Sequence, residues 1–185
     1  NNMSSSVTLV HCTDNSLYGC GRNQYSMFAT GTANQLTPVL ISTNVLDYAT
    51  DGESIILAKT DNTLWVRGLN ANGQLGTGNT TNVTSALTQV SGINDAIKVW
   101  MQADWYSGNM SAYLSSNGIV KFAGYNNDGA FGMTAQNINK TVFTAPSFAA
   151  QGTITDVVIG RNTSTVLTSS GDIWNSGWLP YRGQG

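Results

Sequence analysis

The sequence predicts an all-β protein made of about four small antiparallel sheets, one for each copy of an internal repeat. Three observations support this fold class. A glycine-rich segment recurs along the chain, polar turn residues separate pairs of short apolar runs, and no stretch keeps a helical period over three turns. With 185 residues, 41% of them apolar, the chain is long enough to bury a core of its own.

The clearest copy of the repeat is TDNTLWVRGLNANGQLGTG, at residues 60–78. A second copy, SNGIVKFAGYNNDGAFG, covers residues 116–132, and weaker copies begin at residue 13 (TDNSLYGCGRNQYSMFATG) and at residue 169 (SSGDIWNSGWLPYRGQG). The matched glycines Gly21, Gly68, Gly124 and Gly177 are 47, 56 and 53 residues apart. This spacing is typical of repeated small sheets.

Glycine and asparagine recur at matched positions within the copies, although Ser26 and Ala29 replace two of the glycines in the first copy. Glycine suits a backbone with positive φ or a close approach between chains. Asparagine bonds nearby backbone and stabilises turns. We therefore predict a structural role for Gly21, Gly68, Asn70, Gly73, Gly76, Gly124, Asn126, Gly129, Gly132 and Gly177.

Short apolar runs precede the hairpin turns of the repeat and are expected to be strands. The runs at 54–58, 111–114 and 164–167 each begin with serine, and we align Ser54, Ser111 and Ser164 with one another. Asp61-Asn62, Asn117-Gly118 and Ser170-Gly171 form the turns that follow. The predicted units are residues 1–46, 47–93, 94–150 and 151–185, the last being incomplete.

The segment GLNANGQLGTG and the strand D-N-T-L-W before it resemble the signature of the regulator of chromosome condensation repeat. The resemblance covers nearly the whole chain in four units, although Lys121 replaces the aromatic found at Trp65. It implies a β-propeller, in which each unit is a four-stranded blade within a ring of seven. Four units therefore imply that further blades or a neighbouring chain cover the last unit.

The composition of the chain argues against a nucleic-acid partner, membrane insertion and a metal site. Only 10% of residues are charged and the net charge is −2, so the sequence predicts no nucleic-acid partner. No run of 18 apolar residues is present, and we expect no membrane insertion. Cys12 and Cys20 are expected to be thiols, with a disulfide as the alternative, and with the lone His11 they are too few for a metal site.

No catalytic residue, cofactor or metal is predicted. His11 has no partner that would make a nucleophilic triad, and the carboxylates mostly occupy turn positions. Calcium ligation by the oxygen-rich segment 126–128 is a minor alternative.

The loop MQADWYSGNM, residues 101–110, is longer than its counterparts in the other units. It carries Asp104, Trp105 and Tyr106, and exposed aromatic side chains of this kind anchor protein or sugar partners. We assign these three residues as a binding loop. The alternative is that Trp105 folds back over a blade edge.

These features together predict a non-enzymatic binding scaffold that recognises a protein or glycan partner. Few charges and many Asn, Thr, Ser and Gly residues favour an extracellular or virion-associated module, such as a phage tail or fibre that recognises a host. The family that the sequence resembles also includes nucleotide exchange factors for a small nuclear GTPase, chromatin binders and enzyme inhibitors. The alternatives are therefore an intracellular regulator of a GTPase or of chromatin, or a propeller-type enzyme inhibitor.

Overall fold

The computed structural model describes residues 7–28, 31–102, 108–126, 129–132, 138–146, 153–160 and 163–177. Within these ranges the chain forms four antiparallel sheets and no α-helix. The all-β prediction with one small sheet for each repeat is therefore confirmed.

The first and last sheets have three strands each. The first has the order β1-β2-β3 and the fourth the order β12-β13-β14. Their strands are β1 (Val7–His11), β2 (Leu17–Gly21), β3 (Gln35–Ser42), β12 (Ile154–Gly160), β13 (Thr163–Thr168) and β14 (Ile173–Gly177).

The two middle sheets have four strands each, in the orders β4-β5-β6-β7 and β11-β10-β9-β8. Their strands are β4 (Val45–Thr50), β5 (Ser54–Lys59), β6 (Leu64–Gly68), β7 (Val83–Gln89), β8 (Ala96–Gln102), β9 (Met110–Ser115), β10 (Val120–Gly124) and β11 (Lys140–Thr144). The second sheet begins at Val45, inside the predicted unit 1–46, and the unit boundaries remain a prediction.

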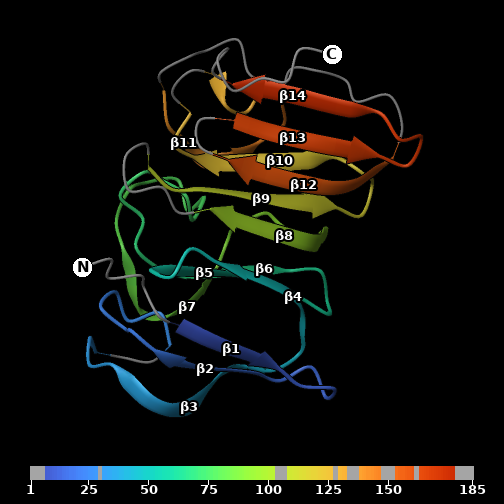
Figure 1. The fold of residues 1–185 in the computed structure, drawn as a ribbon. Helices are drawn as coiled ribbons and strands as arrows, with labels where there is room; N and C mark the ends of the chain where they lie inside the picture. The colour runs from blue at the N-terminus through green and yellow to red at the C-terminus, as the bar shows by residue number, and fades with distance from the viewer. Residues whose placement is uncertain are drawn as a thin grey trace.

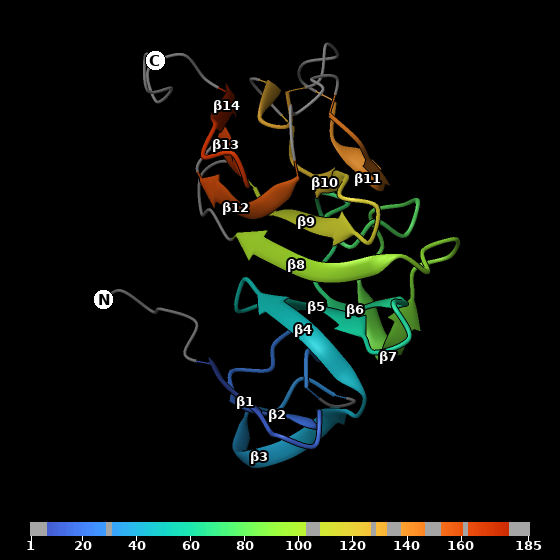
Figure 2. The ribbon, with the colours of Figure 1, turned by 90° about the vertical axis from the view of Figure 1, so that its right-hand side faces the viewer.

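The four sheets follow one another in chain order and stack face to face (Figure 1). Strand β8 contacts both β4 and β12, so one edge strand of each of the last three sheets lies against its counterpart in the next sheet. We call these the inner strands. At the other edge of the middle sheets lie the outer strands β7 and β11, on the right in Figure 2. The outer strand of the first sheet is β3.

Apolar side chains fill the spaces between successive sheets. Leu17 and Phe28 pack with Ile55 and Leu57 between the first two sheets, and similar clusters join the second sheet to the third and the third to the fourth. All of β9 and nearly all of β5 are buried, because each lies between two neighbouring sheets. This explains why these strands show no polar–apolar alternation in the sequence.

The face of the fourth sheet that points away from the third sheet is exposed and carries three apolar side chains beside the polar pair Thr165–Asn175. Val158 is 62% exposed, Leu167 38% and Ile173 64%. By strand register, the pair Leu167–Ile173 corresponds to Ala58–Leu64 of the second sheet, and that pair is fully buried against the third sheet. We call the exposed face the fourth-sheet face.

The first sheet also has an exposed face, on the side away from the second sheet. Val10 lies opposite Tyr18, which lies opposite Leu40, and Val10 and Leu40 are each about half exposed. The corresponding residues of the second sheet, Leu57 and Trp65, pack against the first sheet. Each end of the stack therefore has the surface of an unfinished contact between sheets.

The two cysteines are free and half-buried, as expected for thiols. Cys20 lies opposite Thr8 in the β1–β2 pairing, whereas Cys12 follows the end of β1. The disulfide alternative is therefore wrong, because one strand length separates the two residues.

Candidate interaction face

All four repeat glycines end a strand on the same side of the stack. Gly21, Gly68, Gly124 and Gly177 are the last residues of β2, β6, β10 and β14, with φ between +107° and +116°. The turn between β4 and β5, the end of β8 and the start of β9 lie on this side too, at the left in Figure 1. We call this side the motif face, and the side with the β1–β2, β5–β6, β9–β10 and β13–β14 turns the hairpin face.

Close backbone contact explains why two of these positions, Gly68 and Gly124, carry glycine. A Cβ atom at Gly68 would lie 2.6 Å from Ser54 Cα and closer still to the Glu53 carbonyl oxygen. At Gly124 the equivalent atom would meet the carbonyl of Asn109. The same two carbonyls accept the next backbone N–H groups, from Leu69 at 3.1 Å and Tyr125 at 3.0 Å.

The asparagine two residues after each of the first three glycines is buried and organises the loop that follows. Asn70 Nδ2 donates to Thr77 Oγ1 and to the carbonyls of Asn79 and Thr81, at 3.0–3.2 Å. Its Oδ1 accepts the Leu75 N–H at 2.9 Å. Asn23 and Asn126 accept the N–H groups of Phe28 and Phe131 in the same way.

A second asparagine precedes each outer strand, and the sequence analysis missed it. Asn34 Oδ1 accepts the backbone N–H of Asn23 at 3.2 Å, and Asn82 Oδ1 accepts that of Asn70 at 2.8 Å. The signal was available as an Asn 11 to 13 residues after the motif Asn. The loop between the two asparagines differs in length from one repeat to the next, so the second asparagines do not align when the repeats are compared at a fixed spacing.

The later glycines of the motif allow the loop of one sheet to pack under the next. A Cβ atom at Gly73 would lie 2.9 Å from Thr141 Cα, and one at Gly76 would overlap the Phe143 ring. Gly78 N–H also donates to the Thr141 carbonyl at 2.7 Å. The motif loop of the second sheet is thereby attached to β11 of the third.

Serine hydroxyls on β9 and β13 add a bond between successive sheets. Ser111 Oγ donates to the Gln74 carbonyl, and Ser164 Oγ to the Ala130 carbonyl at 2.6 Å. The predicted alignment of Ser54 with these serines is wrong by one residue. Ser54 pairs with Gly68, so Ile55 holds the equivalent position in β5 and packs in the apolar cluster against the first sheet.

Asp51 lies where the second and third sheets meet. Its carboxylate accepts the N–H groups of Glu53 and Ser54, at 2.9 and 2.6 Å, and Asn109 Nδ2 from the third sheet at 2.8 Å. Burial raises the pKa of Asp51 to about 6, although the two backbone donors act against this shift. The neighbouring Glu53 pairs with Arg22 of the first sheet at 3.7 Å.

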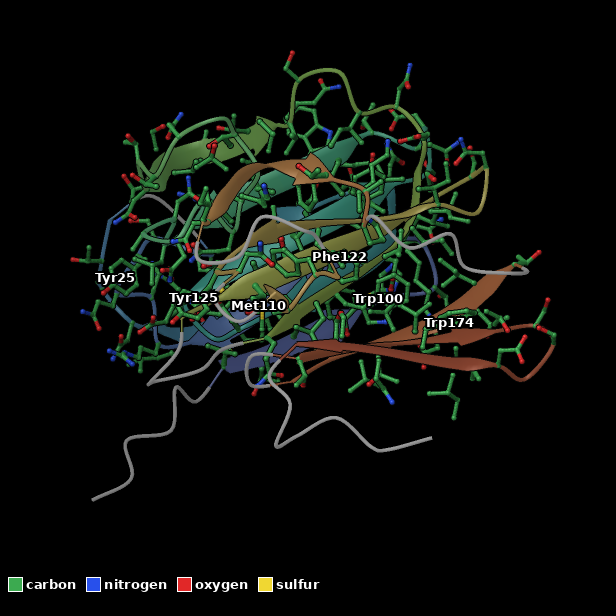
Figure 3. All side chains as sticks on the ribbon, turned by 90° about the horizontal axis from the view of Figure 1, so that it is seen from above. Tyr25, Trp100, Met110, Phe122, Tyr125 and Trp174 are labelled. Atoms are coloured by element: carbon green, nitrogen blue, oxygen red, sulfur yellow. The ribbon has the colours of Figure 1, made fainter. Side chains whose placement is uncertain are left out.

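The predicted binding loop residues Asp104, Trp105 and Tyr106 lie outside the described residues. The strands on either side of them, β8 and β9, end and begin at the motif face, where Gly108 borders Asn72 and Tyr125. Figure 3 shows Tyr25 and Tyr125 on this side of the stack and Trp174 toward the other. The assignment of the loop as a binding site remains a prediction.

Most cations that the structure describes are already bonded within the molecule. Arg22 pairs with Glu53, Lys98 with Asp156 at 3.2 Å, and Lys121 with Asp95 at 3.6 Å. Lys59 donates to the Thr43 carbonyl, and Arg67 donates to the carbonyls of Thr84 and Ser85. Among the described Lys and Arg residues, Arg22, Lys98 and Lys121 pair with carboxylates, whereas Lys59, Arg67 and Lys140 have no carboxylate partner.

His11 contacts the second sheet. Its Nε2 lies 3.0 Å from the Val45 carbonyl, and its ring meets Tyr48 edge to face. Within the described ranges, no three His, Cys, Asp or Glu side chains are grouped closely enough to hold a metal ion. No helix in those ranges could span a membrane.

No family model matches the sequence, and no curated protein matches it. Solved structures do match the fold. Human WBSCR16 aligns with a TM-score of 0.76 and 18% identity, over 94% of this chain and 45% of its own. Prp20p from Saccharomyces cerevisiae, which binds Gsp1p and histones, aligns with a TM-score of 0.78 and 16% identity, over 95% and 42%.

Yeast RCC1 (Prp20) bound to Kap60 gives the same TM-score, 0.78, at 16% identity, over 95% of this chain and 40% of its own. The chain thus spans less than half the length of these neighbours. Four stacked antiparallel sheets and these three alignments show that the chain has the fold of an RCC1-like β-propeller.

Proposed function

We propose that the chain is a non-enzymatic, protein-binding propeller scaffold that acts inside the cell. The neighbours support this proposal, since Prp20p is described as binding Gsp1p and histones and yeast RCC1 was solved with Kap60. The GTPase or chromatin alternative is therefore favoured over the virion or extracellular module, and neither a phage origin nor a glycan partner gains support from the comparisons.

The surface chemistry favours a protein partner over the phosphates of a nucleic acid. Five of the six described Lys and Arg side chains bond to acidic or carbonyl oxygens of the chain itself. Phosphate recognition depends on free Lys and Arg, so a partner on chromatin is more compatible with histone than with DNA.

The motif face is our proposed docking surface. The observation that carries this choice is the anchoring of its loops by buried asparagines and by contacts with the following sheet. A surface fixed in this way loses little conformational entropy when a partner binds. Strand β8 ends and β9 begins on the same face, which supports the proposal that Trp105 and Tyr106, between these strands in the sequence, contribute aromatic anchors there.

Calorimetric titration of the purified chain with Gsp1p and, separately, with core histones tests the proposal. We expect saturable binding to one of them, weakened by at least about 2 kcal/mol in the double variant Trp105→Ala/Tyr106→Ala. Ile119→Ala on the hairpin face is the control, because Ile119 is 43% exposed and distant from the motif face. Binding that is absent for both partners, or equally strong in both variants, contradicts the proposal.

A further inference from the structure

A cavity of about 330 Å³ opens on the outer edge of the second sheet. One wall is the loop that follows the glycine motif, and the other is formed by the two ends of β7 and the residues after it. The lining residues are Thr77, Asn79, Thr81, Asn82, Val83, Thr88, Gln89, Val90 and Ser91. Its volume is at the lower end of the range for ligand pockets, about 300–1,000 Å³.

A bulge in β7 creates the cavity. Gly68 pairs with Val83 and Val66 with Thr88, so a step of two residues on β6 faces a step of five on β7. The extra residues bulge outward and bring Val83 near Thr88. The Arg67 guanidinium donates to two carbonyls of the bulge, those of Thr84 and Ser85, at 3.3 and 3.4 Å.

The opposite wall is fixed by the buried Asn70. Its amide bonds Thr77 Oγ1 and the carbonyls of Asn79 and Thr81, and its backbone N–H bonds Asn82 Oδ1. Both walls are therefore held by side chains from behind. The cavity exists before any ligand enters, which lowers the entropy lost on binding.

Most residues that line the cavity have polar side chains, and none of them is charged. Seven of the nine lining residues have a hydroxyl or an amide, and the partly buried Val83 supplies apolar surface, whereas Val90 is buried in the core. Asn82 Nδ2, the Gln89 amide and the Ser91 hydroxyl form no hydrogen bond to any other described residue. Amides and hydroxyls both donate and accept, so they complement a ligand whose own groups are hydroxyls.

We propose that this cavity binds a neutral carbohydrate of one or two pyranose units. Sugar hydroxyls match the free groups of Asn82, Gln89 and Ser91, and the C–H face of a pyranose matches the apolar surface of Val83. A phosphate or carboxylate would find no cation in the lining to balance its charge. The proposal does not depend on the protein-binding function, because the cavity lies on the outer edge of one sheet.

Two-dimensional NMR of the ¹⁵N-labelled chain tests the proposal with methyl glucoside, methyl mannoside, methyl galactoside, N-acetylglucosamine and maltose. We expect saturable shift changes confined to residues 77–91 for at least one sugar, with a dissociation constant of about 0.1–10 mM. Gln89→Leu and Ser91→Ala should each weaken binding at least fivefold. Both residues are exposed, so neither change should disturb the fold.

The matched control is Ser85→Ala, on the bulge but outside the lining, which should leave the dissociation constant unchanged. Glucose 6-phosphate and glucuronate should bind no more tightly than the neutral sugars. Ribonuclease B and its unglycosylated form ribonuclease A separate a protein-attached glycan from a free sugar as the ligand source. An effect of ribonuclease B alone would identify a protein-attached glycan, and equal effects of the two ribonucleases would identify a free sugar. No binding of any of the five sugars, shifts spread over the whole chain, equal binding in all variants, or stronger binding of the anions would overturn the proposal.

Discussion

Asn70 shows how one polar side chain can fix the course of a long loop. It is fully buried, and its amide group makes four hydrogen bonds to residues between 75 and 81. Such a group must be satisfied inside the protein, because an unpaired buried amide costs about 1–3 kcal/mol. Asn23 fixes the corresponding loop of the first sheet in the same way, because its amide group bonds the Gly31 carbonyl and the Phe28 N–H.

Replacing Asn70 with Ala should therefore lower the free energy of unfolding by about 2–4 kcal/mol, because it leaves several backbone groups unpaired. Chemical denaturation measures this change. Asn79→Ala is the control, since the Asn79 side chain is exposed and bonds only within its own turn. A loss for Asn70→Ala no larger than that for the control would show that the loop does not depend on this amide.

Two constraints require glycine at position 68, a positive φ and a lack of space for a Cβ atom, whereas only the positive φ applies at Gly92. Gly68 has φ of +113° and a Cβ atom there would overlap the backbone of residues 53 and 54, whereas Gly92 has φ of +76° with open space around it. Gly68→Val should destabilise by about 3 kcal/mol and Gly92→Ala by about 1 kcal/mol. Thermal denaturation of both variants measures these losses of stability. Equal losses would show that crowding of the Cβ atom against residues 53 and 54 does not contribute.

Asp51 predicts a pH dependence of stability. Its pKa in the folded protein, about 6, is above the ordinary value of 3.8. Between these two pH values the Asp51 carboxyl is therefore protonated in the folded chain and ionised in the unfolded chain. Its stabilising contribution is present below about pH 4 and is lost as the pH rises through 6. Between pH 4 and 7 the wild type should lose on the order of 2 kcal/mol relative to Asp51→Asn.

Urea denaturation of both proteins at several pH values checks this sign. The comparison with the variant is necessary because the pKa values of Asp14, Asp61 and Asp156 are lowered, and these groups change stability in the opposite direction. A wild type that gains stability relative to Asp51→Asn as the pH rises would contradict the assignment.

At the scale of single elements, the hairpins and glycine turns were predictable from the sequence and the outer strands were not. The turns at 61–62, 117–118 and 170–171 use the local chemistry of Asn, Asp and Gly, which acts regardless of tertiary context. The outer strands β3, β7 and β11 pair irregularly with their neighbours, so their polar–apolar pattern is broken. The binding cavity was unpredictable for the same reason, since it depends on the β7 bulge.

The register of β5 shows a second limit. Aligning serines placed Ser54 with Ser111, but the strand pairing moves it by one residue. A shift of one residue exchanges the two faces of a strand, and in a strand buried on both faces no polar alternation reveals it.

Arg67 lies in β6, in the middle of the second sheet, and its guanidinium bonds the β7 bulge. Burial lowers its pKa, its Nε has no hydrogen-bond partner, and its guanidinium meets carbonyls but no carboxylate. Arg67→Met should change stability by less than about 1 kcal/mol, because it removes an uncompensated cation and keeps the packing volume. Arg67→Ala should cost about 2–4 kcal/mol, since it also leaves a cavity. Equal losses in denaturation would show that the charge itself is required.

For the whole molecule, the exposed faces at the two ends of the stack are the main consequence of the repeat. Each internal face is covered by the next sheet, whereas the fourth-sheet face shows Val158 and Ile173 to solvent. A monomer rarely keeps an apolar surface of this kind uncovered. We propose that further blades or a neighbouring chain cover it.

These 185 residues, expressed alone, should therefore self-associate. Sedimentation velocity should detect dimers or larger species at micromolar concentration, and Val158→Thr/Ile173→Thr should shift the population toward monomer. The matched control Ile138→Thr changes an exposed apolar residue that is not on this face. A stable 19.6 kDa monomer of the unmodified chain would contradict the proposal.

The docking of each motif loop onto the following sheet sets an order for folding during synthesis. The loop at 70–78 reaches its final contacts only when residues 141–143 exist to receive it. A ribosome that adds residues from the amino terminus therefore completes one junction each time it finishes the next sheet. The growing chain should therefore carry one undocked motif loop at a time, the loop of the sheet that was completed last.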